Sequence, residues 1–208
     1  MIQVKVCGLS TAAAIDASVR AGASHVGFVS FAASPRHLPA DSLAALAARV
    51  PSHVARVAVL VDPADEQLSA IAPHVDAVQL HRTAPARVAA IRARWSRETW
   101  AAVPIKTRAD LDAARDYAGA ADRILYDAKT PEGATLPGGM GLRFDWTLLD
   151  GFDHPLPWGL SGGLDPANIA EAIARTRAPL VDVSSGVESA PGVKDVDKIA
   201  AFLQSARR

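Results

Sequence analysis

The amino-acid sequence predicts an α/β protein with the fold of a (β/α)8 TIM barrel, in which eight parallel strands alternate with helices. Short β-rich runs alternate with Ala-rich amphipathic stretches along all 208 residues, a pattern typical of parallel strands joined by crossover helices. Eight such units of about 25 residues fit the lower size limit of this barrel, roughly 200 residues. The main competitor is an open doubly wound sheet, but Cys7-Gly8-Leu9-Ser10 after the first strand lacks the Gly-rich turn of that fold. We therefore predict a single domain over residues 1–208.

Eight runs are predicted to be strands because apolar and β-branched residues dominate them and helical stretches separate them. The first run alternates, so that Val4 and Val6 share one face while Lys5 and Cys7 share the other. In chain order the predicted strands are Ile2–Cys7, His25–Val29, Val54–Val61, Asp76–Leu80, Trp100–Ile105, Arg123–Tyr126, Pro157–Leu160 and Leu180–Val183.

The stretches between the strands carry start signals of helices. Ser10 precedes a Thr-Ala-Ala-Ala run, Pro39 opens a second helical stretch, and Asp62-Pro63 places an N-cap residue before a first-turn proline. The pair of Thr107 and Asp110 resembles a capping box. The segment 128–143 holds four glycines and is predicted to be a mobile loop.

Charge and composition exclude several functions. Lys plus Arg number 22 and Asp plus Glu number 22, so no overall positive field gathers nucleic acid or an anionic membrane. Cys7 is the single cysteine, so an internal disulfide is impossible, and no Cys/His spacing indicates a metal site. No apolar run is long enough to span a bilayer, and the start of the chain alternates where a signal peptide would be continuously apolar. We expect a cytoplasmic protein without a metal, a nucleic-acid partner or a membrane partner.

Polar and glycine residues gather where the predicted strands end, which is where a (β/α)8 barrel builds its active site. The loops after the seventh and eighth strands of such barrels frequently bind phosphate through backbone N–H groups that glycine lets approach closely. Both loops have that composition here. We therefore predict a phosphate-binding site formed by Ser161, Gly162, Gly163, Ser184, Ser185 and Gly186.

Cys7 and Asp127 are the candidate catalytic pair. Cys7 ends the first strand on the inward face of Lys5, whose charge favours the reactive thiolate. Asp127 ends the sixth strand on the face of Leu125, and burial there would raise its pKa and keep it protonated. A base and an acid at one barrel mouth each contribute about 10²- to 10⁴-fold in rate. Taken alone, each has an ordinary explanation, as a buried small cysteine or a turn-forming aspartate.

Three further side chains are candidates for substrate binding. Arg36, in the loop after the second strand, offers a planar fork for a carboxylate or phosphate, although a solvated arginine is the ordinary alternative. His81 shares the inward face with Gln79, where a satisfied core histidine is equally expected. Asp182 points into the barrel with Leu180, where it can bind a sugar hydroxyl or anchor its strand.

Short segments in a fixed order carry a resemblance that covers nearly the whole chain. They are Val4-Lys5-Val6-Cys7-Gly8-Leu9, residues 22–29 with Ser34-Pro35-Arg36, Gln79-Leu80-His81, Leu125-Tyr126-Asp127, residues 138–141 with Phe144-Asp145-Trp146, residues 160–164, residues 181–188 and Pro191-Gly192-Val193-Lys194-Asp195. In these segments the chain resembles the phosphoribosylanthranilate isomerase family of tryptophan biosynthesis, whose members are (β/α)8 enzymes.

The resemblance implies an Amadori rearrangement of N-(5-phosphoribosyl)anthranilate to 1-(2-carboxyphenylamino)-1-deoxyribulose 5-phosphate. It implies that Asp127 protonates the ribose ring oxygen and that Cys7 removes the proton from C2. Arg36 would hold the anthranilate carboxylate, Asp182 would contact the sugar, and the glycine loops would hold the phosphate. No cofactor is implied, because the imine itself accepts the electron pair. The expected partner is thus a phosphorylated small molecule, and the expected assembly is a monomer or a homodimer.

Departures and alternatives complete the prediction. Arg82 stands where the family usually has glycine, and Met140 where it commonly has Thr or Ser. Barrels that also isomerise the histidine-pathway substrate resemble a two-aspartate arrangement, so Cys7 argues against dual specificity. One alternative is a noncatalytic sugar-phosphate-sensing barrel, which should have lost Cys7 or Asp127. Another is a different sugar-phosphate enzyme, such as an epimerase or lyase, which only Lys5 favours.

Overall fold

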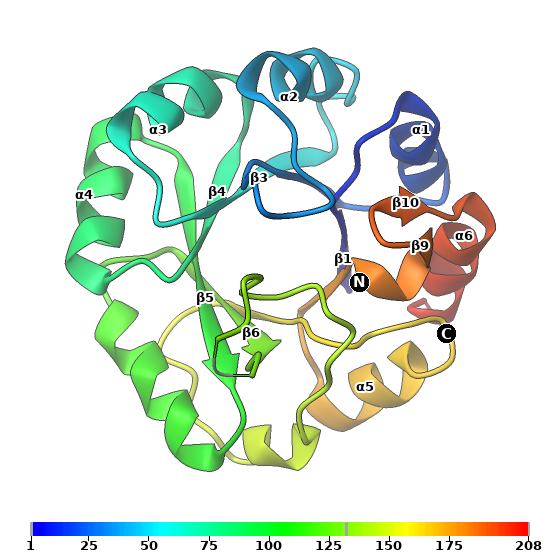
Figure 1. Ribbon diagram of the computed structural model, residues 1–208. Coiled ribbons are helices and arrows are strands. Elements are labelled where there is room, and N and C mark those ends of the chain that lie inside the picture. The colour runs from blue at the N-terminus through cyan, green and yellow to red at the C-terminus, as the bar shows by residue number, and fades with distance from the viewer. Residues whose placement is uncertain (1, 132, 208) are drawn as a thin grey trace.

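The computed structural model describes residues 2–131 and 133–207. In this part of the chain eight parallel strands pair in sequence order, and the first also pairs with the last, which closes the sheet into a barrel. Figure 1 shows the helices as a ring around it, and the predicted barrel is confirmed. The strands are β1 Gln3–Cys7, β2 His25–Val29, β3 Ala55–Val61, β4 Ala77–His81, β5 Glu98–Ile105, β6 Arg123–Ala128, β7 Trp158–Leu160 and β8 Leu180–Val183.

The crossovers differ in kind around the ring. Most are α-helices, but 3₁₀ turns connect β5 to β6 and β6 to β7, and in the first of these only Leu111 and Ala114 are buried, three residues apart as a 3₁₀ turn requires. The α-helices are α1 Ala12–Arg20, α2 Ala40–Ala47, α3 Asp65–Ile71, α4 Pro85–Trp95, α5 Ile169–Thr176 and α6 Val196–Ser205; the 3₁₀ turns are η1 Ala72–His74, η2 Arg108–Tyr117, η3 Trp146–Leu149 and η4 Ser185–Val187; and a small hairpin pairs β9 Glu188–Ala190 with β10 Val193–Lys194.

Two helix starts differ from the prediction. Thr11, and not Ser10, caps α1, because its hydroxyl accepts a hydrogen bond from the backbone N–H of Ala14. Asp62 does not cap a helix, since its φ of 41° is left-handed and α3 begins only at Asp65. The starts at Pro39 before α2 and at the capping box of η2 are confirmed.

β5 begins two residues earlier than predicted, at Glu98, and two strands extend further at their carboxyl ends. β4 includes His81, and β6 runs through Asp127 to Ala128. The sequence predicts that these strands end at Leu80 and Tyr126, so that His81 and Asp127 would follow them. The cause is pairing with neighbours, because β3 pairs with His81 and β5 pairs with both Asp127 and Ala128. The sheet therefore holds these two side chains more rigidly than a loop would. Glu132, in the predicted loop 128–143, lies outside the described residues.

The barrel interior is filled in layers, as the strand alternation predicts. Lys5 and Gln79 occupy the middle, and both are almost completely buried. Cys7 lies at the mouth with Val29 and Val59, whereas Tyr126 faces outward and packs against Phe152 and Trp158. The amino-terminal layer is mainly apolar, and buried His25 packs against its Trp100; its apolar residues are Val57, Ala77, Trp100, Leu125 and Leu180.

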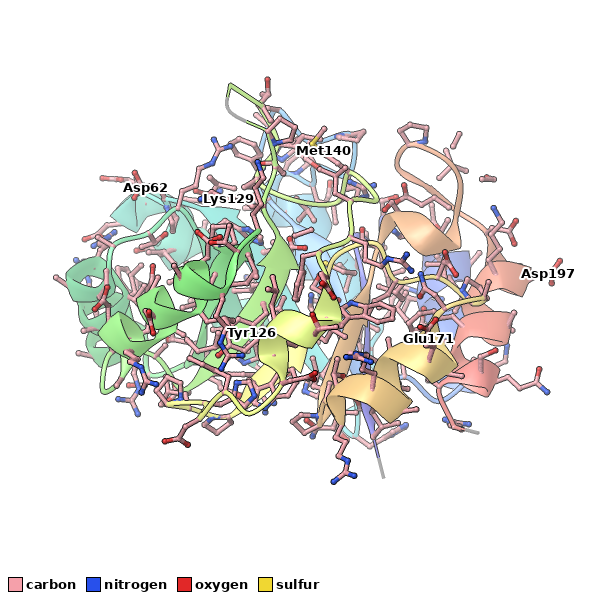
Figure 2. The ribbon with its side chains drawn as sticks, turned by 90° about the horizontal axis from the view of Figure 1, so that it is seen from below. Asp62, Tyr126, Lys129, Met140, Glu171 and Asp197 are labelled. Atoms are coloured by element: carbon pink, nitrogen blue, oxygen red, sulfur yellow. The ribbon has the colours of Figure 1, made fainter. Side chains whose placement is uncertain are left out.

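Figure 2 shows the barrel from the side, with the mouth at the upper edge of the view. Met140 and Lys129, from the loop after β6, lie at this edge, and Tyr126 lies lower down. None of the helices formed by residues 2–131 and 133–207 has the length and apolar character needed to cross a membrane.

Candidate active site

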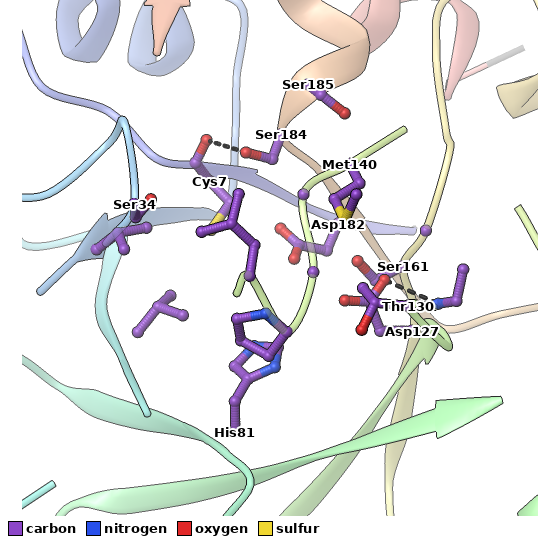
Figure 3. Close-up of a pocket in the computed structure, with 18 of the residues that line it drawn as sticks. Cys7, Ser34, His81, Asp127, Thr130, Met140, Ser161, Asp182, Ser184 and Ser185 are labelled. Carbon is purple, nitrogen blue, oxygen red and sulfur yellow. Dashed lines mark hydrogen bonds between the residues drawn. The ribbon is translucent and has the colours of Figure 1, made fainter. Parts of the chain in front are cut away.

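A cavity, partly open to solvent, lies at the carboxyl ends of the strands. Figure 3 shows Cys7 and Asp127 on two sides of this cavity, with Asp182 between them in that view. The predicted site residues that line it are Cys7, Arg36, His81, Asp127, Asp182, Ser161, Gly162, Gly163, Ser184 and Ser185. The structure thus brings together every predicted site residue except Gly186.

Cys7 is held at the end of β1 beside Gly27 of β2, with which it pairs. A side chain at Gly27 would place its Cβ 2.8 Å from the Cys7 sulfur, so glycine makes room for the thiol. Cys7 is 6% exposed. Burial raises its pKa, and the charge of nearby Lys5 offsets part of that rise.

Asp127 is the second buried reactive group at the mouth. One of its carboxylate oxygens accepts a hydrogen bond of 2.9 Å from the backbone N–H of Ala128. Burial, followed by the negative charge of Asp182, raises the pKa of Asp127 to about 7. A carboxyl group in this range holds its proton in a large fraction of molecules at neutral pH, which suits a general acid.

A chain of polar contacts connects the middle layer to the mouth. Lys5 Nζ lies 3.0 Å from an Asp182 carboxylate oxygen and donates to Gln79 Oε1 at 2.9 Å. Although burial alone lowers the pKa of Lys5, the Asp182 carboxylate raises it on balance, so Lys5 stays charged. Asp182 therefore serves the strand-anchoring role that the sequence left open, and its carboxylate also faces the cavity.

The same chain sets the protonation of His81. Because Gln79 Oε1 accepts from Lys5, Gln79 Nε2 is the donor to His81 Nε2, 2.9 Å away. Burial lowers the pKa of His81 to about 4, so the ring is neutral and carries its proton on Nδ1. His81 can thus donate one hydrogen bond from Nδ1.

Arg36 is not the solvated arginine of the ordinary explanation. Its side chain is 6% exposed, and Nε and Nη2 each donate to a carboxylate oxygen of Glu188 at 2.7 Å. Nη2 also donates to the carbonyl oxygen of Gly139 at 3.1 Å. Among the described residues Nη1 has no hydrogen-bond partner, so this nitrogen is available to a ligand.

Sequence reasoning assigned no role to Glu188 or Lys194, although both lie in segments that carry the resemblance. Lys194 Nζ donates to Glu188 Oε1 at 2.6 Å and to the carbonyl oxygen of Ser184 at 2.9 Å. No local pattern signals the contact between Glu188 and Arg36, because Glu188 stands 152 positions after Arg36 in the chain.

The two glycine loops meet at one side of the cavity. Gly162 and Gly163 adopt φ values of 90° and 62°, which glycine tolerates without strain. Ser185 begins the short turn η4, where the first N–H groups have no partner within the turn. Gly186 does not line the cavity, and a Cβ there would collide with the carbonyl of Leu164. Packing against that carbonyl explains why Gly186 does not line the cavity.

Part of the loop after β6 lies over these groups. A Cβ at Gly138 would collide with the Asp127 carboxylate, and one at Gly139 would lie 2.7 Å from Arg36 Nη1. Glycine at both positions therefore lets the backbone approach the two functional side chains. Within the described residues, no three His, Cys, Asp or Glu side chains gather as a metal site requires.

Comparison with known proteins gives a consistent result. A family model described as N-(5'phosphoribosyl)anthranilate (PRA) isomerase matches residues 4–205. The chain is 53% identical to the N-(5'-phosphoribosyl)anthranilate isomerase of Rhodopseudomonas palustris (strain BisA53), over 99% of this chain and 96% of that protein. It is 51% identical to the same enzyme of Zymomonas mobilis subsp. pomaceae, over 99% and 98% of the two chains.

Solved structures agree with the sequence comparison. The crystal structure of phosphoribosyl anthranilate isomerase from Thermotoga maritima superposes with a TM-score of 0.89 at 34% identity, covering 100% of this chain and 99% of that one. A crystal structure of the isomerase in complex with reduced 1-(o-carboxyphenylamino)-1-deoxyribulose 5-phosphate superposes with a TM-score of 0.84 at 33% identity and the same coverage. A third describes mutually generated monomers of the dimeric Thermotoga maritima enzyme, with a TM-score of 0.83 at 34% identity and the same coverage.

These matches confirm the predicted resemblance, the fold and the enzyme class. They extend over almost the whole chain, and the two curated relatives share more than half of their aligned residues with it. The chain belongs to the N-(5'-phosphoribosyl)anthranilate isomerase family and is an isomerase of tryptophan biosynthesis.

Proposed function

We propose that this enzyme converts N-(5-phosphoribosyl)anthranilate to 1-(2-carboxyphenylamino)-1-deoxyribulose 5-phosphate, with Asp127 as the general acid and Cys7 as the general base. The observation that carries the proposal is the pairing of a buried carboxyl and a buried thiol in one cavity, on β6 and β1. The names of the relatives and the complex with a reduced product analogue in a similar structure support the choice of substrate.

Asp127 supplies the proton that opens the sugar ring. Its pKa of about 7 leaves it protonated in much of the population at neutral pH. Transfer of that proton to the ribose ring oxygen lets the C1–O bond break while the lone pair of the anthranilate nitrogen forms a C=N bond. The product of this step is an open-chain imine with a positive charge on nitrogen, and Asp127 is left as a carboxylate.

Cys7 removes the proton from C2 in the second step. The electron pair of the C–H bond forms a C1–C2 double bond, and the imine nitrogen accepts the pair of the former C=N bond. The resulting enolamine tautomerises to the ketone product, as C1 gains a proton and the C2 hydroxyl loses one. Lys5 supports this step, because a buried cation beside the thiol stabilises its thiolate form.

The remaining residues of the cavity bind the substrate. The serine and glycine loops after β7 and β8 would hold the phosphate through backbone N–H groups and hydroxyls. Arg36 would hold the anthranilate carboxylate through Nη1. The Nδ1–H of His81 and the carboxylate of Asp182 would contact the sugar hydroxyls, as donor and acceptor respectively.

One assay tests this proposal. The substrate is formed in place from anthranilate and phosphoribosyl pyrophosphate by a transferase, and its anthranilate-type fluorescence is followed after the enzyme is added. We expect loss of fluorescence with the wild type, and a kcat at least about a hundredfold lower with Cys7→Ala. If the wild type binds the substrate but leaves the fluorescence unchanged at micromolar enzyme, the alternative of a phosphate-sensing barrel is correct.

Assembly and location stay predictions. We propose that the protein is a monomer or a homodimer in the cytoplasm. A dimeric relative from Thermotoga maritima supports the second possibility. Light scattering on the purified protein distinguishes the two assemblies.

A further inference from the structure

The β9–β10 hairpin places two buried charges next to Arg36, which lines the cavity. Figure 1 shows this hairpin beside α6. Its first strand begins with Glu188 and its second ends with Lys194. The side chains of Arg36, Glu188 and Lys194 are 6%, 5% and 2% exposed. Three charged side chains at this burial are stable only because they compensate one another.

Glu188 is saturated with donors. Its Oε1 accepts from Arg36 Nε and from Lys194 Nζ, and its Oε2 accepts from Arg36 Nη2 and from the backbone N–H of Gly192. Although burial alone raises the pKa of Glu188, the two cations hold it below the usual range, so the carboxylate is ionised. The contact with Arg36 is a two-bond fork, which fixes the plane of the guanidinium as well as its position.

Arg36 needs such a fixation for selective binding. A free arginine side chain has several rotatable bonds, and ordering it when a ligand binds weakens affinity. The fork with Glu188 orders the guanidinium beforehand and leaves Nη1 without a partner among the described residues. Lys194 keeps the cluster attractive to an anion, because two cations and one carboxylate carry a net charge of +1.

We propose that Glu188, balanced by Lys194, is a positioning residue that orients the Arg36 guanidinium toward the aromatic carboxylate of the substrate. The inference rests on the proposed function, in which Arg36 binds that carboxylate. Lys194 also links the cluster to the phosphate loop, since its ammonium donates to the carbonyl of Ser184. Lys194 thus connects the residues that would bind the aromatic carboxylate to the loop that would bind the phosphate of the same substrate.

The direction in which Glu188→Gln changes the affinity for the carboxylate distinguishes a positioning role from a purely electrostatic one. Glu188→Gln retains the size of the side chain and removes its negative charge, so the net charge of the cluster rises from +1 to +2. If Glu188 only weakens the field of Arg36, this variant should bind the carboxylate more tightly. If Glu188 positions Arg36, the variant should bind it more weakly despite the larger positive charge.

The experiment measures binding of two probes that differ only in the carboxylate. The first is the product, 1-(2-carboxyphenylamino)-1-deoxyribulose 5-phosphate, and the second is the same compound made from aniline. For Glu188→Gln we expect a Kd about tenfold higher for the first probe and an unchanged Kd for the second. Asp150→Asn, which removes an exposed partner of Arg175, is the matched control and should bind both probes as the wild type does.

A second variant keeps the test decisive if Glu188→Gln does not fold. Arg36→Lys retains the charge but cannot form the two-bond fork, so it should lose the preference for the carboxylated probe to a similar extent. Full preference in Arg36→Lys, or tighter carboxylate binding in Glu188→Gln, would overturn the inference. Equal weakening of both probes by Glu188→Gln, with a lower Tm, would also overturn it, because a general structural role predicts that result.

Arg36→Met distinguishes the failure of this inference from failure of the proposed function. If Arg36→Met binds both probes as the wild type does, Arg36 does not hold the carboxylate and the proposed binding role itself is wrong. If Arg36→Met loses the preference and Glu188→Gln keeps it, only the positioning role is wrong. In the double variant of Arg36→Met and Glu188→Gln, we expect no loss beyond that of Arg36→Met alone.

Discussion

The two ends of the barrel interior are equally buried but differ in chemistry. At the amino-terminal end an apolar cluster dominates, with His25 against Trp100 as its ionisable neighbour, whereas the mouth combines several ionisable side chains with Val29 and Val59. The same strands supply both layers, because β6 carries Leu125 below and Asp127 above, and β8 carries Leu180 below and Asp182 above. Two residues along a strand, a rise of about 7 Å, separate a side chain that stabilises the fold from one that serves the reaction.

This difference has a physical cause. An apolar side chain gains free energy when it leaves water, whereas an ionisable one loses solvation and responds with a shifted pKa. Every ionisable group of the mouth whose pKa shifts strongly has burial as its first cause, including Cys7, His81 and Asp127. The lower layer therefore stabilises the fold, whereas burial of ionisable groups at the mouth lowers stability and holds these groups in reactive protonation states.

Asp127→Asn is the sharpest way to break this comparison. The amide keeps the shape of the side chain but cannot donate the proton that opens the ring, so kcat should fall about 10²- to 10⁴-fold. Steady-state kinetics by the fluorescence assay measure the loss. Binding of inorganic phosphate serves as the control and should not change. A kcat within threefold of the wild type would remove Asp127 from the role of general acid.

The pH dependence of stability gives the next largest effect. Asp127 has a folded pKa of about 7 against an ordinary value of 3.8, so the folded state binds the extra proton between these values. The contribution of Asp127 to the free energy of unfolding is fully present below about pH 4. This contribution, on the order of 4 kcal/mol, is lost as the pH rises through 7. The free energy of unfolding of Asp127→Asn, relative to that of the wild type, should therefore increase as the pH rises from 4 to 8.

Urea denaturation of the wild type and of Asp127→Asn at pH 4 and pH 8 measures this change in the free energy of unfolding. His25 and His81 act in the opposite direction, since their folded pKa values of about 4 lie below the ordinary 6.5, and their contribution is lost as the pH falls. Both histidines are present in wild type and variant, so their effect cancels in the difference. Parallel pH profiles of the two proteins would show that Asp127 is ionised throughout this range.

Leu125→Ala tests the lower layer with the reverse expectation. Leu125 is completely buried among Trp100, Leu180 and the other apolar residues of that layer. Its truncation should lower the free energy of unfolding by about 3 kcal/mol, through lost burial and the cavity that remains. Because Leu125 contacts no reacting group, kcat at 25 °C should stay within twofold of the wild type. A kcat reduced tenfold or more in the folded variant would show that the two layers are not independent.

The sequence predicts the site much better than it predicts the contacts that hold it. Strand alternation places Cys7, Asp127 and Asp182 on the inward face, and local patterns predict most strand ends to within a residue. The partner of Arg36 does not, because Glu188 reaches it from a hairpin at the other end of the chain. Such pairings depend on the closure of the barrel, which joins β1 to β8. Local patterns in a single sequence do not show which distant residues this closure brings into contact.

Local backbone geometry shows the same limit. Asp62-Pro63 has the composition of a helix start, but tertiary contacts place Asp62 in a left-handed turn after β3, with its backbone N–H donating to the carbonyl of His81. The longer β6 is a second case, since pairing with β5 decides where that strand ends. In both places a neighbouring strand overrides the local preference of the residues.

The smallest expected effect concerns left-handed residues at the two ends of the barrel. At the lower end Ser96 terminates α4 with φ 50°, a position that favours glycine. At the mouth Arg82 has φ 52° directly after β4, and its Nη2 donates to the carbonyl of Ala134 at 2.9 Å. Ser96→Gly should therefore raise the free energy of unfolding by about 0.5 kcal/mol, and Arg82→Gly should leave it nearly unchanged.

The reason for the unequal result is that glycine relieves backbone strain at both positions but removes a hydrogen bond only at Arg82. Thermal unfolding of the two variants, measured beside the wild type, resolves a difference of this size as a shift of roughly 1–2 °C in Tm. Equal gains in both variants would mean that the exposed contact between Arg82 and Ala134 contributes nothing. A loss of stability in Arg82→Gly would mean that this contact outweighs the strain, and that the arginine fastens the loop over Asp127.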